Sequence, residues 1–173
     1  SAFWILVANS FMQHPVGYAL RNGRVEMTDF VALITNPYAI LQFFHTLFAC
    51  MATGGCLILA ISAYKMLQRG PAAPAFRKCL GAAAVYTIVG LTAAMGTGHM
   101  QAQQIGQVQP MKLASMEALW ESASPAPFTV FALIDENKQE NSMAFEVPYA
   151  LSLMLYNRPE GEVKGIKELQ EMY

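Results

Sequence analysis

An apolar run in the first half of the chain constrains its fold more than any other feature. No charged side chain occurs from Tyr38 until Lys65, so roughly 27 consecutive residues are uncharged, whereas a helix needs only ~20 to cross the hydrocarbon core of a bilayer. Asn36 and Pro37 come just before the run, and they are typical of the N-cap and the first position of a helix. We therefore predict a transmembrane helix over residues 37–68.

A single histidine, His45, lies inside this run at a depth of roughly 10 Å, given a rise of ~1.5 Å per residue. An ionisable group at that depth is costly in hydrocarbon, so we expect it to face protein or a cofactor. Imidazole is a common axial ligand of heme iron, and Gly54 and Gly55 leave part of the same helix open to a flat ring or to another helix. A histidine hydrogen-bonded to a neighbouring helix is the alternative, which this stretch alone leaves open.

The composition is that of a membrane protein. Of the 173 residues, 54% are hydrophobic and 13% are charged, against about 25% charged residues in typical soluble proteins. The net charge is −1 and the basic residues are scattered, which gives no argument for binding nucleic acid. Cys50, Cys56 and Cys79 form no CxxC pair, so we interpret them as small buried hydrophobic residues.

Two further apolar segments flank the predicted helix. Residues 1–13 resemble the end of a transmembrane helix, with Ser1 and Asn9 as polar positions on adjacent faces, and residues 77–99 form another apolar run. Residues 14–36 are expected to be an outer connection, because they contain charges and an Asn-Gly turn signal. Since the chain begins within a helix, we expect it to be a piece of a longer protein.

The predicted orientation follows from a basic loop at residues 69–76. Lys65, Arg69, Arg77 and Lys78 lie in or beside this short loop, and no acidic residue lies among them. The positive-inside rule therefore places the loop in the cytoplasm. The histidine, at the other end of the preceding helix, is then expected near the outer face of the membrane.

Residues 100–173 are more polar, and we predict an extracytoplasmic and partly irregular loop there. The stretch from Met111 to Glu121 is predicted to be an amphipathic helix. Its apolar stripe consists of Leu113, Met116 and Trp120, which recur at helical spacing. A loop with such an apolar face should pack on the membrane domain or lie at the membrane interface.

Lys112 and Glu117 are the charges of interest on this stretch. Five residues correspond to ~500° of rotation along a helix, so these side chains point ~140° apart and do not pair within it. They are therefore open to other partners, although two solvated surface charges are the alternative. Further along, Phe128 to Ile134 is β-prone, and Ile166 to Met172 is predicted to begin another helix.

Three motifs occur in a fixed order: WILVANSFMQHPVG, the NP-x(7)-HT arrangement around His45, and QPMKLASMEALWE. Together they resemble subunit I of the cytochrome bd quinol oxidases of bacterial and archaeal respiratory membranes. The resemblance covers essentially the whole chain and corresponds to the end of the fourth membrane helix, the fifth and sixth helices, and the front part of the outer quinol loop. It implies an all-α fold, an integral membrane helical bundle of which this chain is a fragment, with a partly irregular extracytoplasmic loop.

The resemblance implies roles for five residues. His45 corresponds to an axial ligand of the low-spin heme b, whose second ligand is a methionine on a helix beyond this chain. Lys112 and Glu117 match the lysine and glutamate implicated in quinol binding and oxidation. Ser1 and Asn9 match polar residues of a proton route toward the oxygen-reducing hemes. Those hemes, a further heme b and a heme d, have their ligands in segments absent from this chain.

One run departs from the family pattern. Members often carry an acid after the glycine of a GD-x-H pattern that ends the sixth helix, whereas this chain has Gly96-Thr97-Gly98-His99. A quinol or proton role of that acid therefore does not carry over, and His99 is a minor quinol-site candidate.

The activity implied is that of a respiratory terminal oxidase, which passes electrons from membrane quinol through heme b to oxygen-reducing hemes and forms water, as part of a complete complex. The implied partners are the remainder of subunit I, a second membrane subunit (subunit II), small single-helix subunits and membrane quinol, in a multi-pass protein of a bacterial or archaeal cytoplasmic membrane. One alternative is a related heme b subunit that takes electrons from quinol but lacks the oxygen site. Another is a non-redox helical scaffold in which His45 only hydrogen-bonds.

Overall fold

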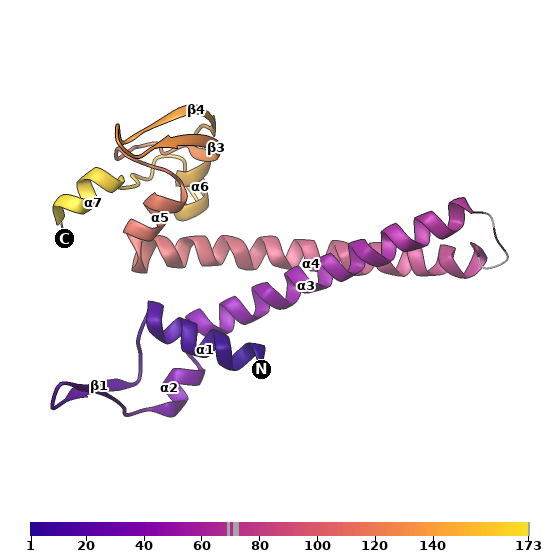
Figure 1. The fold of residues 1–173 in the computed structure, drawn as a ribbon, viewed down its shortest axis with the longest axis horizontal. Coiled ribbons are helices and arrows are strands. Elements are labelled where there is room, and N and C mark those ends of the chain that lie inside the picture. The colour runs from indigo at the N-terminus through magenta and orange to yellow at the C-terminus, as the bar shows by residue number, and fades with distance from the viewer. Residues whose placement is uncertain (69, 71–72, 173) are drawn as a thin grey trace. The chain divides into compact units, whose positions relative to one another are not determined.

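The computed structural model describes residues 1–68, 70 and 73–172, which form two compact units, residues 1–98 and 99–173. Figure 1 shows the first unit in indigo to pink and most of the second in orange and yellow. The basic loop predicted at 69–76 includes residues 69, 71 and 72, which lie outside the described residues. Its cytoplasmic placement therefore stays a prediction.

Two long helices make up most of the first unit. α3 (Pro37–Leu67) and α4 (Ala73–Val108) are both long and apolar enough to cross a membrane, by length and composition. They run in opposite directions in Figure 1. α4 is longer at both ends than the apolar run predicted at 77–99 and continues into the second unit. The helical fold class expected from the sequence is what the structure shows.

The first turn of α3 is built as the sequence predicts. The side chain of Asn36 accepts a hydrogen bond from the backbone N–H of Tyr38 at 3.0 Å, and Pro37 takes the first position, where a helix needs no N–H donor. The amide of Asn36 also donates to the backbone carbonyl of His14 at 3.1 Å. The cap therefore ties the end of α1 (Ala2–Gln13) to the start of α3.

The chain between α1 and α3 forms a small hairpin and a short helix. β1 (Tyr18–Arg21) and β2 (Arg24–Met27) pair antiparallel around Asn22 and Gly23, whose φ angles are 50° and 73°. Positive φ at both positions is the tight hairpin turn that Asn-Gly favours, so the sequence predicts the turn but not the strands around it. α2 (Phe30–Ile34) is a short helix within the connection expected at residues 14–36.

α3 and α4 approach each other closely at two glycines. A Cβ atom added at Gly90 would lie 2.8 Å from the backbone nitrogen of Ala52 and 3.1 Å from the carbonyl oxygen of Phe48. A Cβ atom added at Gly55 would lie 3.2 Å from Cα of Thr87. Such close backbone approach is typical of small residues between membrane helices. The two glycines therefore set the separation of the helices.

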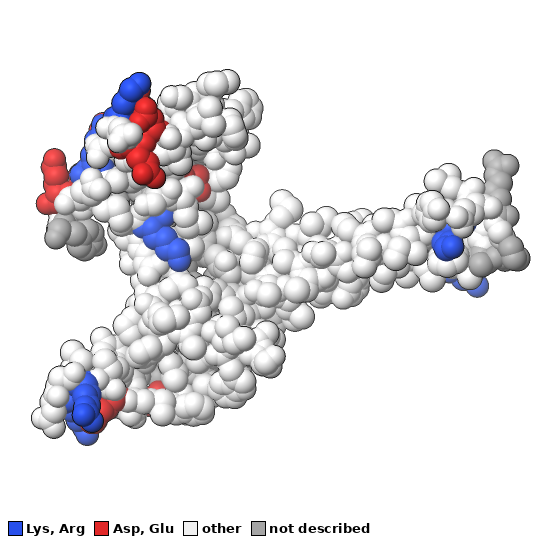
Figure 2. Space-filling model, in the orientation of Figure 1, with Lys and Arg blue, Asp and Glu red and all other residues white. Residues whose placement is uncertain are grey.

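The outside of this helix pair is apolar over most of its length. On the face shown in Figure 2 the pair is drawn almost entirely in white, with Lys and Arg atoms near its loop end. Cys50, Cys56 and Cys79 are exposed free thiols, which corrects the prediction that they are buried. Small residues such as Gly55 and Gly90 occupy the face where the helices meet, so the cysteines lie outside that contact.

The second unit is a compact arrangement of short elements. They are α5 (Pro110–Met116), β3 (Phe128–Asp135), β4 (Glu140–Val147), α6 (Ala150–Tyr156) and α7 (Ile166–Met172). β3 and β4 form an antiparallel hairpin, and their pairing shifts register between Thr129 and Phe131 and again before Leu133. α7 has the bounds predicted for it, and β3 begins where the β-prone run begins.

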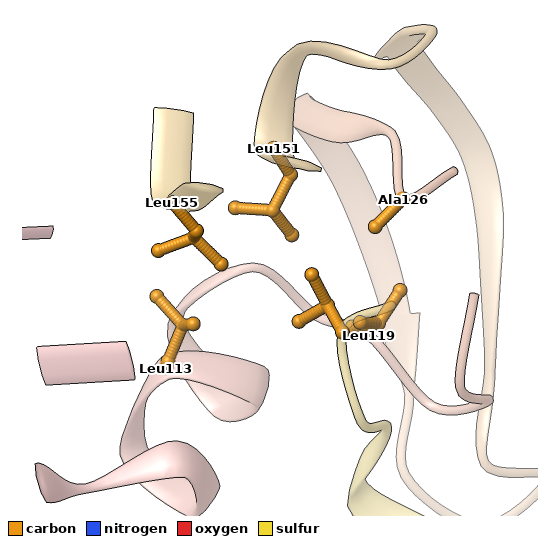
Figure 3. Packing of buried hydrophobic residues seen from close by; sticks show 6 residues of the cluster. Leu113, Leu119, Ala126, Leu151 and Leu155 are labelled. Carbon is orange, nitrogen blue, oxygen red and sulfur yellow. The ribbon is translucent and has the colours of Figure 1, made fainter. Parts of the chain in front are cut away.

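A leucine-rich core holds the second unit together. Leu113 of α5 and Leu151 and Leu155 of α6 are buried with Leu119 and Ala126 (Figure 3). Burial of apolar surface contributes roughly 25 cal/mol per Å² and is the main favourable term in folding. This core therefore fixes α5 against α6.

α5 is shorter than the helix predicted over Met111 to Glu121. It ends at Met116. The N–H of Leu119 donates a hydrogen bond to the carbonyl of Ala114 at 2.9 Å, and Ala118 has a φ of 49°. This is the Schellman arrangement of a helix C-terminus, with a left-handed residue just beyond the cap. The prediction of a helix is therefore wrong over the second half of that stretch.

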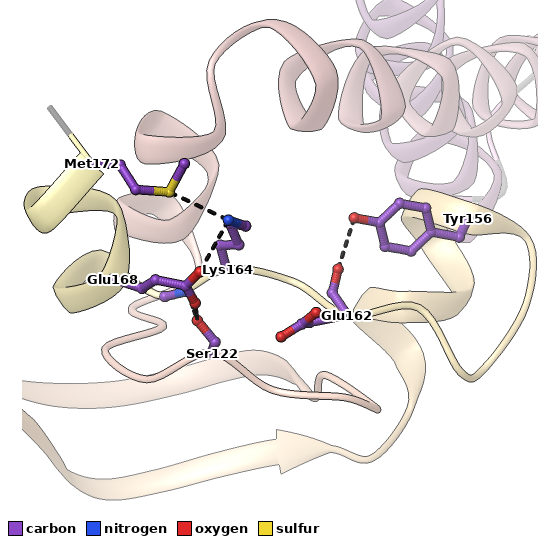
Figure 4. Close-up of polar contacts among 7 residues, drawn as sticks. Ser122, Tyr156, Glu162, Lys164, Glu168 and Met172 are labelled. Carbon is purple, nitrogen blue, oxygen red and sulfur yellow. Dashed lines mark hydrogen bonds and ion pairs between the residues drawn. The ribbon is translucent and has the colours of Figure 1, made fainter.

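The segment from Lys164 to Glu168 packs on the chain that follows α5. The backbone N–H of Gly165 donates to the hydroxyl of Ser122 at 2.9 Å, and that hydroxyl donates to the carboxylate of Glu168 (Figure 4). Lys164 forms an ion pair with Glu168 at 3.0 Å. The Ser122 hydroxyl and the Lys164 ammonium lower the pKa of Glu168, because both favour its charged form.

Candidate functional site

His45 lies on the face of α3 that meets α4. Its Nδ1 atom is 3.1 Å from the carbonyl oxygen of Ala94 and 3.1 Å from the hydroxyl oxygen of Thr97. A carbonyl oxygen can only accept a hydrogen bond. Nδ1 is therefore protonated and donates a hydrogen bond to the carbonyl oxygen of Ala94. This contact fixes the tautomer and leaves a lone pair on Nε2.

The second ring nitrogen of His45 differs from Nδ1 in its contacts. Within the described residues Nε2 has no hydrogen-bond partner, and the side chain is half-buried. Gly98 lies against the ring, since a Cβ atom there would be 3.2 Å from Cε1 of His45. A histidine that donates one ring N–H to a carbonyl and keeps the other nitrogen unprotonated has the usual arrangement of a metal ligand.

His45 has the chemistry of an axial ligand to a heme iron. In the part of the chain that the structure describes, no group of three or more His, Cys, Asp or Glu side chains could hold a metal ion. Heme iron takes only axial ligands from the protein, and histidine is a common one. One oriented imidazole between apolar helices is therefore compatible with an axial heme ligand.

Thr97 is the second group beside Nδ1. Its hydroxyl donates to the carbonyl oxygen of Ala93 at 2.8 Å, one turn earlier on α4. The hydroxyl oxygen thus has lone pairs available for the N–H of His45. A neutral side chain occupies the position where the resembled family often carries an acid.

The two polar positions of α1 have different surroundings. The amide of Asn9 donates to Oε1 of Gln42 in α3 at 3.3 Å, and the hydroxyl of Ser10 lies 3.5 Å from the same oxygen. Ser1 is the exposed N-cap of α1 and makes no side-chain capping hydrogen bond within the described chain. Asn9 therefore contacts α3 through Gln42, and Ser1 does not share this contact.

Glu117 and Lys112 are in contrasting environments. Glu117, directly after α5, is buried with 9% of its surface exposed, whereas Lys112 on α5 is exposed. Burial raises the pKa of Glu117, and a hydrogen bond from the backbone of Thr129 partly opposes this rise. Glu117 is therefore not a solvated surface charge. For Lys112 the alternative of a surface charge without a role in quinol oxidation stays open.

His99 belongs to a polar network at the start of the second unit. Its Nε2 atom lies 3.0 Å from Oδ1 of Asn157 and 3.1 Å from the amide nitrogen of Gln103. Gln103 also donates to the carbonyl of Met154 at 3.3 Å. His99 therefore links α4 to the end of α6, which is a structural role inside this unit.

Sequence reasoning missed several residues that surround these sites: Gln42, Thr97, Gly98, Thr129 and Asn141. Gln42 had a visible signal, because it is a polar residue three positions before His45 in the apolar run. Thr97 and Gly98 stood in the run that departs from the family pattern. Thr129 and Asn141 gave no local signal, since their contacts join segments far apart in the chain.

Comparisons with known proteins cover the whole chain. The family model described as cytochrome bd terminal oxidase subunit I matches residues 1–173. Cytochrome bd ubiquinol oxidase subunit 1 of Bacillus subtilis (strain 168) is 48% identical over 177 residues, which are 100% of this chain and 37% of the relative. Cytochrome bd-II ubiquinol oxidase subunit 1 of Escherichia coli (strain K12) is 37% identical over 175 residues, 98% of this chain and 33% of the relative. The chain thus spans little more than a third of the length of these curated relatives.

A solved structure has the same fold. The bd oxidase from Geobacillus thermodenitrificans matches with a TM-score of 0.85 and 28% sequence identity, over 98% of this chain and 39% of the matched chain. The match and the two long apolar helices together identify a helical fragment of a membrane protein.

Proposed function

Because this chain belongs to the cytochrome bd terminal oxidase subunit I family, we propose that it is the heme-binding, quinol-oxidising part of a respiratory terminal oxidase. In this proposal the complete complex takes electrons from membrane quinol, delivers them to oxygen and forms water. The observation that carries the proposal is the arrangement of His45, whose Nδ1 is held by the carbonyl of Ala94 while Nε2 keeps its lone pair.

His45 is the proposed axial ligand of a low-spin heme b. The hydrogen bond to Ala94 at 3.1 Å supports this role because it sets the tautomer, and the absence of a side chain at Gly98 lets the ring lie against α4. Bound there, heme b supplies a one-electron relay toward a further heme b and a heme d, which we assign to parts of the subunit outside this chain. The contribution of this chain is to ligate, to orient the imidazole and to exclude water.

Glu117 and Lys112 are the proposed quinol residues. Oxidation of a quinol to a quinone releases two electrons and two protons, so a proton acceptor is needed near the quinol hydroxyls. Burial raises the pKa of Glu117, which makes its carboxylate a stronger base than a solvated one. Lys112, exposed on α5, is the proposed hydrogen-bond donor that holds a quinol oxygen.

Ser1 and Asn9 are proposed members of a proton route toward the oxygen-reducing hemes. Support comes from the contacts of Asn9 and Ser10 with the same oxygen of Gln42, which gather polar side chains between two apolar helices. Polar groups inside a membrane are costly and often mark functional paths. Ser1 joins the route only through the likeness of its helix to the corresponding helix of the family.

We further propose a multi-pass position in a bacterial or archaeal cytoplasmic membrane. Lys65 and Lys78 flank residues 69–76 and support a cytoplasmic position for that loop, which leaves residues 100–173 on the outer side. The exposed apolar faces of α3 and α4 are proposed contacts for lipid, the remainder of subunit I, subunit II and small single-helix subunits.

Replacement of the proposed ligand tests the proposal directly. In the complete subunit, His45→Ala should remove the low-spin heme b and leave much of the membrane fold, because one iron ligand is lost from a helix otherwise held by packing. The heme content and the reduced-minus-oxidised spectrum of the purified complex measure this. The matched control is His14→Ala, since His14 uses its backbone carbonyl and not its ring to bind Asn36.

The control variant should keep the wild-type spectrum. If His45→Ala retains the low-spin heme at wild-type stoichiometry, the ligand assignment is wrong and the scaffold alternative replaces it. An equal loss of heme in both variants would also count against a specific role of His45.

A further inference from the structure

The turn that carries Glu117 is fastened by a side chain from a distant strand. Asn141, in β4, donates from Nδ2 to the carbonyl oxygen of Ala118 at 2.8 Å. Its Oδ1 atom accepts a hydrogen bond from the indole N–H of Trp120 at 3.0 Å. Both polar atoms of the amide are therefore engaged, which fixes the direction in which the amide points. Asn141 thus bridges the backbone and the side chain of the turn that follows Glu117.

This turn adopts a backbone conformation that its own residues do not favour. Ala118 has a φ of 49°, in the left-handed region that glycine adopts easily and alanine does not. Glycine is the usual residue at this position of a helix C-terminus. The hydrogen bond that Asn141 donates to the Ala118 carbonyl therefore stabilises a conformation that the local sequence leaves strained.

The same hairpin also contacts the carboxylate of Glu117. The backbone of Thr129, in β3, donates a hydrogen bond to this carboxylate. The pairing of β3 with β4 shifts register between Thr129 and Phe131, and such irregularities commonly turn backbone groups away from the ladder. β3 thus contacts the Glu117 side chain, and β4 contacts the backbone next to it.

We propose that Asn141 is a positioning residue for quinol oxidation, which acts through Ala118 and Trp120 to hold Glu117 where its carboxylate meets a quinol hydroxyl. The inference rests on the proposed role of Glu117 as proton acceptor. Asn141 does not touch the quinol in this scheme, so its effect is on the geometry of another residue. Misplacement of a catalytic group by about 1 Å costs on the order of a hundredfold in rate.

Kinetics on variants of the complete oxidase test this inference. Asn141→Ala should lower kcat with a soluble quinol by about tenfold to a hundredfold. KM should stay near the wild-type value because Lys112 is untouched, and the heme spectrum should not change. The matched control is Asn137→Ala, at the exposed tip of the same hairpin, which should behave as the wild type.

A double-mutant cycle separates positioning from a general effect on stability. In a Glu117→Gln background, Asn141→Ala should change kcat by less than about twofold, because a residue that acts through Glu117 has nothing left to position. Losses that add in full would overturn the inference, and so would a wild-type kcat in Asn141→Ala. Wild-type kinetics of Glu117→Gln alone would overturn the proposed role of Glu117 and, with it, this inference.

Trp120→Phe tests the positioning role of Asn141 if the complex with Asn141→Ala does not assemble. It removes the indole N–H that orients the amide but keeps an aromatic ring and Asn141 itself. A several-fold fall in kcat that disappears in the Glu117→Gln background supports the inference, and an unchanged kcat overturns it.

Discussion

His45 and Glu117 are both oriented before any ligand binds, but different kinds of structure hold them. His45 is set by two regular helices, because the carbonyl of Ala94 accepts a hydrogen bond from its Nδ1–H and Gly98 leaves space for the ring. Glu117 is set by irregular backbone, between the end of a short helix and the left-handed Ala118, and it accepts its hydrogen bond from Thr129 in a strand. The first site depends on the fit of two helices, and the second depends on single contacts between distant segments.

The two sites should therefore respond differently to substitution. An added side chain between α3 and α4 displaces a whole helix face, because packed helices do not deform locally. In the second unit the leucine core is formed by apolar side chains, so we expect it to persist when one hydrogen bond around Glu117 is lost. Substitutions between the helices should therefore change stability and heme retention together, and substitutions around Glu117 should change the rate of quinol oxidation.

The largest expected effect is on rate, and it would sharpen the comparison. Glu117→Gln removes the proposed proton acceptor and should lower kcat by ~10²–10⁴-fold, the usual contribution of a general base, without changing the heme spectrum. Lys112→Ala should instead raise KM, because it removes the proposed donor to a quinol oxygen. Steady-state kinetics of the complete complex with a soluble quinol measures both effects.

An artificial electron donor that bypasses the loop provides the control. It should reduce the hemes of both variants at the wild-type rate, since both side chains are proposed to act before electrons reach the iron. Unchanged kcat and KM in both variants would leave Lys112 a surface charge and Glu117 a buried structural residue.

An intermediate effect is expected on the stability of the helix pair. Gly90→Ala places a Cβ atom 2.8 Å from the backbone nitrogen of Ala52, and overpacking of this kind costs about 1–3 kcal/mol. Gly81→Ala on the same helix is the control, because among the described residues nothing lies within 4 Å of its Cβ. The apparent Tm and the heme retention of the purified complex should fall for Gly90→Ala only. Equal values for the two variants would show that this contact does not hold the helices.

The smallest expected effect is a pH-dependent gain in stability. Burial raises the pKa of Glu117 above its ordinary value of 4.5, so the folded state prefers the protonated form. The stability that protonation contributes is complete below the ordinary pKa and is lost as the pH rises through the raised pKa of the folded state. Glu117→Gln is neutral at every pH, so it should raise the apparent Tm at neutral pH and have little effect in acid. A gain of the same size at every pH would assign the effect to packing.

Much of the fold can be predicted because helices have local signals. Asn36 and Pro37 predict the start of α3, and the cap lies there. A helix was also predicted to begin at Ile166, and α7 begins there. α5 was predicted too long because the apolar stripe continues to Trp120, while the residue that ends the helix, Ala118, is not the glycine that marks such ends.

The candidate site can be predicted only in its chemically distinctive residues. His45 stands out because an imidazole in an apolar run is costly. Its partners and those of Glu117 do not stand out, since Asn141 bonds to residues 21 and 23 positions away and no helical or strand period relates them. The contact of Glu117 with the backbone of Thr129 likewise joins residues of different elements, and the residues around position 117 do not encode it.

The close approach at Gly90 has a consequence for the axial alignment of the two helices. His45, Phe48 and Ala52 recur at i, i+3 and i+7 on one face of α3, so the histidine lies on the same helix face as the contact at Gly90. Sliding by one residue moves a helix by ~1.5 Å, and a hydrogen bond of 3.1 Å between Nδ1 and Ala94 does not survive such a displacement.

Alignment of long membrane helices also responds to the bilayer around them. A hydrocarbon layer thinner or thicker than the apolar length of a helix changes its tilt, at a cost of a fraction of a kcal/mol per Å. We expect the glycine contacts to resist that change, because the two helix backbones already approach each other closely there. We therefore expect the thickness of the bilayer to influence the orientation of His45 through the relative position of α3 and α4, without direct contact between the side chain and lipid.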